Sequence, residues 1–383
     1  TVVRVESHRR PDLLRILLPF KDYIPALDRG VLFPTANTNK YSVALDISKP
    51  EGKEIAKRLI VWGDIVTESF SPGTMKRMGL DYEEASKLNP DIIYFSTSSQ
   101  GQYGPLASFA AYGAQSASLA GLALLCGHPE HDPVHVYGAY TDFLAPYYLA
   151  FALIGALNRR RKTGKGMYLD QSQVESGVTM IAPSVLDYTV NGRIARRMAN
   201  RDPRAAPHGA YKCQGDDRWI TIAVFSKDEW AGFCKTLGQP EWTSDSKFRN
   251  LAGRKENEDE LDRLVAEWTI KYTAEQVMDL MQAQGVPAGI ASTGEDLYND
   301  PQLKHREHFV YLEHKVIGRH AYQNEAIRFS KSPPEFRKAG PCIGEDNEYI
   351  YKDILGLSDD DISNLLAEGT ITTDLDTPTV SSY

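Results

Sequence analysis

Several features that would assign a protein to a particular class are absent from this chain of 383 residues. Lys and Arg number 43 against 51 Asp and Glu, a formal net charge of −8, which argues against a nucleic-acid-binding protein because such proteins carry basic surfaces. The longest nearly apolar run, 143–157, includes Pro146 and is shorter than the roughly 18 residues of a membrane span. We therefore predict a buried helix there. No signal peptide is evident, and we expect no membrane partner.

Cysteine is scarce, and its spacing forms no metal-binding or disulfide pattern. The four cysteines are Cys126, Cys213, Cys234 and Cys342, and none belongs to a C-x-x-C pair. A chain of this length can fold without covalent crosslinks. We expect reduced thiols and a cytoplasmic protein without a metal ion.

Three histidines, His128, His131 and His135, lie close together in the sequence. Imidazoles at such spacing can bind a metal, but Pro129 and Pro133 make a helix that would align them improbable. A solvated surface loop is the favoured interpretation, and a metal site is the alternative. No P-loop, dinucleotide-binding glycine pattern or G-x-S-x-G motif occurs.

What is present is an alternation of strand and helix patterns. Short apolar strands are predicted at 65–66 and 92–95, with helices after Pro50 and at 82–88, 113–124 and 143–157. This order predicts a parallel α/β sheet with helices on both faces. The composition changes near Asn191, where Arg, Pro and Ala become frequent. A strand at 219–224 follows, with helices at 228–237, 261–272, 274–284 and 359–368 and strands at 309–315 and 326–329. The strand-like start at 2–5 without a Met predicts an upstream segment.

Asp142 and His208 are the candidate catalytic side chains. Asp142 stands where a loop meets the apolar run, so it can be an ordinary N-cap or a nucleophilic carboxylate beside apolar residues. His208 can be a general base or a packed histidine. The basic groups, Lys76 with Arg77 and the 159–165 segment, are either solvated or contact phosphates. From these residues alone, the sequence predicts an α/β enzyme with an anionic ligand.

Several sequence blocks together resemble the class III CoA-transferase family, the CaiB/BaiF type that includes formyl-CoA transferase, carnitine CoA-transferase and α-methylacyl-CoA racemase. Residues 37–52 resemble its N-x-NK-x-S-x-x-LDL…PEG block, and residues 64–79 resemble ADVLVENFRPGTLERLG. Residues 101–105 and 163–166 resemble its GQ-x-GP and TGKG segments. The likeness is closest over residues 1–225.

The resemblance implies a fold and an assembly. A large Rossmann-like domain with a parallel sheet is expected from both ends of the chain, with a smaller inserted α+β domain, in an interlocked dimer. The expected ranges are 1–190 for the first part of the large domain, 191–209 for a linker, 210–300 for the small domain and 301–383 for the return and C-terminal tail. A homodimer is expected, with a heteromer of related subunits as the alternative.

The resemblance also implies an activity and its residues. CoA would move between an acyl-CoA and a free carboxylic acid, with Asp142 as the nucleophile that forms an anhydride and then an aspartyl-CoA thioester. CoA is expected as a co-substrate. The residues implied to contact CoA are Ser69, Phe70, Arg77, Met78 and Tyr112. His208 and Gly209 match a loop that covers the active site in some members.

Two departures from the family's pattern leave alternatives open. The racemase branch has a histidine at the position of Tyr112, so a transferase is favoured over a 2-methylacyl-CoA racemase or epimerase. Gly113 replaces an acid found in formyl-CoA transferase, which disfavours oxalate and formyl-CoA as substrates. A third possibility is a CoA-binding subunit of a heteromer. The aromatic residues Phe143, Tyr147, Tyr148 and Tyr188 suggest a larger acyl group.

Overall fold

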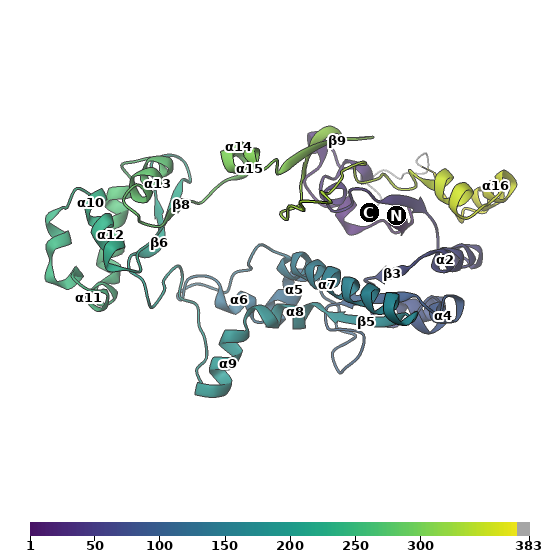
Figure 1. Cartoon of the computed structure of the whole chain (residues 1–383), viewed down its shortest axis with the longest axis horizontal. Helices are drawn as coiled ribbons and strands as arrows, with labels where there is room; N and C mark the ends of the chain where they lie inside the picture. Colours follow the sequence, from purple (N-terminus) through teal and green to yellow (C-terminus); the bar gives the residue numbers. More distant parts are fainter. Residues whose placement is uncertain (374–383) are drawn as a thin grey trace. The chain divides into compact units, whose positions relative to one another are not determined.

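The computed structural model describes residues 1–373, and its contacts divide the chain into two compact units (Figure 1). Unit 1 comprises 1–110, 143–176 and the segment from Tyr298 onward, and unit 2 comprises 111–142 and 177–297. The sequence placed 111–142 and 177–190 with the first domain, whereas their contacts are with unit 2. The expected C-terminal tail lies outside the described residues from 374 onward.

Unit 1 contains the predicted parallel strands. β1 (Val3–Glu6) pairs with β2 (Tyr41–Ala44), and β3 (Ile65–Glu68), β4 (Ile93–Ser98) and β5 (Met167–Ser172) form a second sheet in that order. Three helices follow β2 and β3, namely α2 (Pro50–Trp62), α3 (Thr74–Met78) and α4 (Tyr82–Leu88). α2 begins with Pro50, whose missing N–H costs nothing in a first turn. Its buried Ile55 and Ile60 belong to one core with residues of β2, β4 and the 349–355 segment.

A buried ionic cluster joins both ends of the chain within unit 1. The Arg15 side chain is 1% exposed and donates to both carboxylate oxygens of Glu6, at 3.0 and 2.8 Å. It also forms an ion pair with Asp28 at 2.5 Å and donates to the Pro341 carbonyl at 3.0 Å. Its guanidinium carbon lies 3.4 Å from the centre of the Phe33 ring. Glu6, Asp28 and Phe33 come from the N-terminal segment, and the Pro341 carbonyl connects this cluster to the C-terminal part of the chain.

Unit 1 also contains a β-hairpin and several short helices. β9 (Phe309–His314) pairs with β10 (Gly318–Gln323) in antiparallel fashion. The prediction of a strand at 326–329 was wrong, because the chain turns back earlier, at Gly318 with φ +81°. Its short helices include α1 (Leu32–Ala36), α15 (Pro301–His305), a π-helical segment Tyr349–Ile354 and α16 (Asp359–Ala367), with α14 (Gly294–Asn299) at the boundary with unit 2.

His314, the last residue of β9, is buried in its neutral form. It is 2% exposed, and its Nδ1 accepts hydrogen bonds from the backbone N–H groups of Val316 and Ile317 at 3.2 and 3.1 Å. Burial lowers the pKa of His314 to about 4, and the nearby His320 acts in the same direction. A protonated His314 could not accept these bonds through Nδ1, so the fold selects the neutral ring.

Acidification should therefore destabilise the protein through His314. Because its pKa is lower in the folded chain, the unfolded chain binds the extra proton between pH 6.5 and about 4, and stability falls as pH falls through that window. From pH 7 to pH 5 the loss from this residue should be about 2 kcal/mol. Urea unfolding at both pH values should show a correspondingly smaller loss in His314→Asn, which keeps an acceptor but does not titrate. Equal losses in the two proteins would contradict this assignment.

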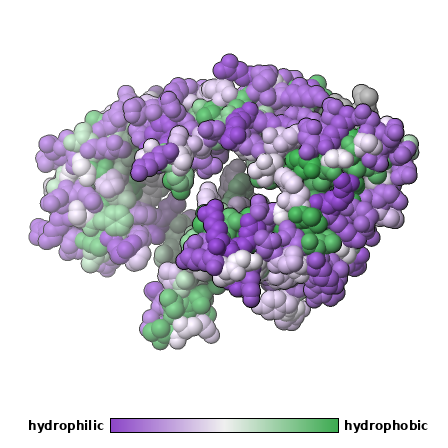
Figure 2. Space-filling view, turned by 45° about the vertical axis from the view of Figure 1, so that its right-hand side comes forward, coloured by the Kyte–Doolittle hydropathy of each residue, from purple (hydrophilic) through white to green (hydrophobic). Residues whose placement is uncertain are grey.

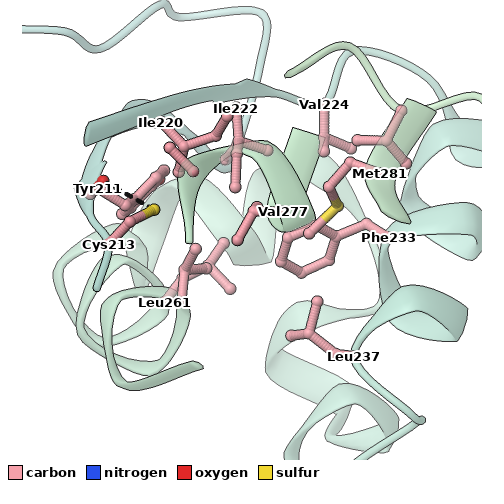
Figure 3. Packing of buried hydrophobic residues seen from close by; sticks show 14 of the residues in the cluster. Tyr211, Cys213, Ile220, Ile222, Val224, Phe233, Leu237, Leu261, Val277 and Met281 are labelled. Atoms are coloured by element: carbon pink, nitrogen blue, oxygen red, sulfur yellow. Dashed lines mark hydrogen bonds between the residues drawn. The ribbon is translucent and has the colours of Figure 1, made fainter. Parts of the chain in front are cut away.

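Unit 2 contains an antiparallel sheet covered by helices. β6 (His208–Lys212), β7 (Trp219–Ala223) and β8 (Ala288–Ile290) pair in that order. The surrounding helices are α10 (Lys227–Thr236), α11 (Leu251–Glu256), α12 (Glu258–Thr269) and α13 (Ala274–Gln282), three of them at the predicted places. Figure 3 shows Ile220 and Ile222 of β7 facing Phe233, Leu261, Val277 and Met281 of the helices. The other helices of this unit are α5 (Gly113–Leu119), α6 (Leu122–Leu125), α9 (Ala182–Asn191) and part of α8 (Gln173–Met180).

The apolar helix α7 (Tyr140–Thr163) differs from the prediction of a buried helix. It is longer than predicted, and Phe143, Tyr147, Phe151 and Ile154 are 58–79% exposed along one stripe. Only its opposite side, with Ala145 and Ala156, is buried. Within residues 1–373, α7 is the one helix long and apolar enough to cross a membrane by length and composition. Within a single chain, the apolar side chains along this stripe of α7 therefore remain exposed.

Candidate active site

Asp142 lies in the first turn of α7, so it is not the N-cap that was one of its two predicted roles. The helix begins at Tyr140, and the Asp142 N–H donates to the Ala139 carbonyl at 2.9 Å, which closes the turn before this residue. The side chain is exposed, and so is that of the next residue, Phe143. The predicted apolar shielding of the carboxylate is therefore not provided by this chain alone, because the apolar side chains of α7 face outward.

The carboxylate of Asp142 rests against the start of α5. A Cβ placed on Gly113 would lie 2.4 Å from Asp142 Oδ2 and 2.6 Å from its Cγ, so the carboxylate fills the space of a side chain at position 113. Tyr112 precedes this glycine, is 69% exposed, and its N–H donates to Gln115 Oε1 at 3.2 Å. Unit 2 thus brings Asp142 against Gly113, which follows Tyr112 and lies 29 residues before Asp142 in the sequence.

The four predicted CoA contacts of unit 1 lie on one short segment after β3. Ser69, Phe70 and Arg77 are exposed and Met78 is half-buried. Arg77 donates to Thr74 Oγ1 at 2.8 Å. The segment turns at Gly73, whose φ of +76° favours glycine. Such a loop at the carboxyl end of a parallel strand is a common ligand-binding position.

Two carboxylates beside this segment were missed from the sequence. Glu68 ends β3, faces Ser96 of β4 and accepts the Phe70 N–H at 2.7 Å. Asp170 of β5 also pairs with Ser96 and accepts the Gln102 N–H with both oxygens, at 3.1 and 3.0 Å. Burial raises the pKa of Glu68, and the nearby Asp170 charge raises it further. The hydrogen bonds from Ser96 and Phe70 act in the opposite direction but do not cancel this increase. An acid at the carboxyl end of a predicted strand was the available signal.

His208 and Gly209 lie on strand β6, and their role in covering an active site stays a prediction. The His208 Nδ1 is bonded to the Asn200 carbonyl, and its ring meets Phe225 edge-on with centres 5.7 Å apart. Both residues line a hollow of about 760 Å³ in unit 2, whose wall also includes Arg201 and Gln282. Arg201 is paired with Asp259 and Asp262. This histidine is held by its Nδ1, and its charge is among the causes that lower the pKa of the nearby Asp202 carboxyl.

Within residues 1–373, no group of three or more His, Cys, Asp or Glu side chains is arranged to hold a metal ion. The rings of His128 and His131 lie 5.4 Å apart between centres. The segment 128–138 contains no helix or strand. This loop structure is the predicted one, since Pro129 and Pro133 interrupt regular structure.

Comparison with known proteins gives a consistent result. The family model described as CoA-transferase family III matches residues 1–347. A succinyl-CoA–D-citramalate CoA-transferase of Chloroflexus aurantiacus is 32% identical over 343 residues, covering 90% of this chain and 85% of that protein. A succinyl-CoA:glutarate CoA-transferase of Homo sapiens is 29% identical, covering 88% of this chain and 76% of that protein.

A solved structure agrees over nearly the same extent. A CaiB/BaiF family protein from Brucella suis matches with a TM-score of 0.83 and 27% identity, over 92% of this chain and 91% of that chain. The mixed α/β architecture with parallel strands is therefore shared. On the family match and these relatives, the chain is an enzyme that belongs to CoA-transferase family III, as its sequence blocks predicted.

Proposed function

We propose that this enzyme moves CoA from an acyl-CoA to a free carboxylic acid, with the Asp142 carboxylate as the nucleophile. The observation that carries the proposal is the placement of Asp142. Asp142 is exposed in the first turn of α7, and its carboxylate lies against Gly113, the first residue of α5. The family resemblance assigns the catalytic acid to position 142. Membership in CoA-transferase family III and the activities of the named relatives support it.

The reaction balances without a metal, an oxidant or a net proton. A carboxylate oxygen of Asp142 attacks the thioester carbonyl, the C–S bond breaks, and a mixed anhydride and CoA thiolate form. The thiolate attacks the aspartyl carbonyl, which releases the donor acid and leaves an aspartyl-CoA thioester. The acceptor carboxylate repeats these steps in reverse and regenerates Asp142. A carboxylate suits this role because it is a nucleophile at neutral pH and is recovered unchanged.

The proposed CoA site uses the segment after β3. Arg77 supplies a cation for phosphate, and Ser69, Phe70 and Met78 supply polar and apolar contacts on the same short loop. The Glu68 carboxylate fixes the start of this loop through the Phe70 N–H. Tyr112, an exposed residue that directly precedes Gly113, is proposed to contribute beside Asp142.

Succinyl-CoA is the first donor to test, because the C. aurantiacus and human relatives are named for it. Dicarboxylic acids are the corresponding acceptors. An aromatic acid tests the alternative suggested by the aromatic side chains around α7. An Acetobacter aceti relative, 29% identical over 280 residues, is named an acetyl-CoA:oxalate CoA-transferase, so oxalate also belongs in the panel.

The test is covalent capture on the wild-type protein. Incubation with succinyl-CoA, followed by peptide mass spectrometry, should place a CoA adduct on the peptide that contains Asp142, and hydroxylamine should convert that residue to a hydroxamate only when acyl-CoA is present. Transfer without modification of Asp142 would refute the assignment. Deuterium exchange at the substrate α-carbon without an acceptor acid would instead support the racemase alternative.

We also propose that the enzyme works as a dimer of two copies. The exposed stripe of α7, with Phe143, Tyr147, Phe151 and Ile154, is too apolar to remain in water without cost. Hydrophobic residues also cover the surface of α9, where Leu186 and Val190 are 61% and 78% exposed (Figure 2). A second copy that covers α7 would also shield the neighbouring Asp142. A related second subunit is the alternative, since two C. aurantiacus relatives are named as α and β subunits of one transferase.

A charge on the α7 stripe should separate the subunits. Phe151→Glu replaces a 79% exposed ring by a carboxylate that would be buried in the proposed interface, so the dimer's dissociation constant should rise by at least ~100-fold. Gln302→Glu adds the same charge to the exposed surface of α15 and serves as the matched control. Sedimentation velocity over a concentration series gives the constants. A Phe151→Glu protein that dimerises like the control would rule out this stripe.

A further inference from the structure

The Asp142 carboxylate occupies a space, here called its seat, that exists because residue 113 has no side chain. A Cβ at Gly113 would lie 2.4 Å from Oδ2 and 2.6 Å from Cγ of Asp142, and 2.9 Å from the Ala139 Cβ. Separations below 3.0 Å are essentially never adopted by a real Cβ, so any other residue at 113 has to push the carboxylate aside. The backbone of Gly113 is not in the left-handed region, which leaves close approach as the reason for glycine here.

A second contact ties the same glycine to α7. Thr141 is completely buried, and its hydroxyl donates to the Gly113 carbonyl at 3.0 Å. Its methyl group packs toward α8, where a Cβ on Gly177 would approach it to 3.3 Å. Two successive residues of the first turn of α7 therefore hold one residue of α5, Thr141 through the carbonyl and Asp142 across the Cα.

This arrangement bears on the position of the Asp142 carboxylate oxygen, which in the proposed function attacks the thioester carbon. Covalent attack requires the nucleophilic oxygen about 3–3.5 Å from the carbonyl carbon, and an error of about 1 Å can cost ~100-fold in rate. Asp142 is an exposed residue in the first turn of α7. The contact with Gly113 supplies the restraint from one side, and the Thr141 bond keeps Gly113 in place.

We propose that Gly113 and Thr141 are positioning residues that fix the Asp142 carboxylate for attack on the thioester. The inference rests on the proposed function, because it concerns the nucleophile assigned there. It assigns these residues no contact with substrate. Glycine at this position also differs from the acid that the family resemblance places there in formyl-CoA transferase.

Gly113→Ala tests the seat, with Gly294→Ala at the first residue of α14 as its matched control. A Cβ on Gly294 meets no atom within 4 Å, so that variant should behave as wild type. With Gly113→Ala we expect the rate of Asp142 adduct formation and kcat to fall by ~100-fold, while KM for the acyl-CoA changes by less than about threefold. Adduct formation at the wild-type rate in Gly113→Ala would overturn the proposal.

Thr141→Val and Thr141→Ser keep the proposal testable if Gly113→Ala fails to fold. Valine retains the shape and removes the hydroxyl, whereas serine restores the hydroxyl and removes the methyl group. We expect kcat about tenfold lower in Thr141→Val and mostly restored in Thr141→Ser. Equal kcat in wild type and Thr141→Val would overturn the role of Thr141. The two proposals fail in different ways. If the wild type transfers CoA without an Asp142 adduct, the proposed function fails. If the wild type forms the adduct and the variants form it equally fast, only the positioning role fails.

Discussion

Replacing Asp142 by Asn should reduce CoA transfer by at least ~1,000-fold, because the amide has the shape of the carboxylate but its nitrogen is not nucleophilic. The change preserves the packing against Gly113, so the fold and the affinity for CoA should stay close to wild type. Initial rates of succinyl-CoA-dependent transfer, together with calorimetric titration of CoA, separate the two quantities. Substantial transfer by the variant would contradict the nucleophile assignment.

Two control variants make this comparison specific. Asp228→Asn alters another exposed aspartate in the first turn of a helix, α10, and should leave transfer unchanged. Asp142→Ala cannot revert by deamidation, as an asparagine slowly can. Residual activity present in Asp142→Asn and absent from Asp142→Ala would therefore come from regenerated aspartate. If Asp228→Asn lost activity to the same degree, the effect would reflect charge or stability and not nucleophilic attack.

Local structure was predictable where the signal itself was local. The parallel strands β3 and β4, the helices α10, α12 and α13, and the end of α7 at the positive-φ Gly164 follow from apolar periodicity and glycine placement. The predicted helix 113–124 is in fact α5 and α6, divided at Gly121 with φ +84°. That glycine was visible, but its conformation depends on packing, since a side chain there would approach Ile181 to 2.9 Å.

Long-range arrangement was less accessible, and the candidate site shows why. Sequence blocks identified Asp142 and the segment 69–78, because each block is contiguous. The seat on Gly113 joins residues from two helices, and spacing alone does not specify that contact. Exposure of α7 was missed for a related reason. An apolar run indicates that a surface becomes covered, but it does not say whether the same chain covers it.

The second large effect concerns stability. Arg15→Met should lower the free energy of unfolding by ~3–5 kcal/mol, because buried Asp28 loses its ion pair and buried Glu6 keeps only the half-buried Arg4 as a cation. Methionine retains much of the packing on Phe33, so the loss is attributable mainly to charge. Arg263→Met removes an exposed ion pair with Glu267 and should change stability by less than about 1 kcal/mol. Urea unfolding followed by circular dichroism measures both.

Two further measurements connect that loss to the unpaired carboxylates. Burial alone would raise the pKa of Glu6, but the hydrogen bond and charge of Arg15 bring it below its usual value. At Asp28 burial outweighs the charge of Arg15, so the pKa of Asp28 is raised. Without Arg15 both carboxyls should favour the protonated form, so the deficit of Arg15→Met relative to wild type should shrink as pH falls from 7 to 5. Adding Glu6→Gln and Asp28→Asn should recover a substantial part of the stability at pH 7. A triple variant no more stable than Arg15→Met, with a deficit independent of pH, would show that Arg15 acts through packing.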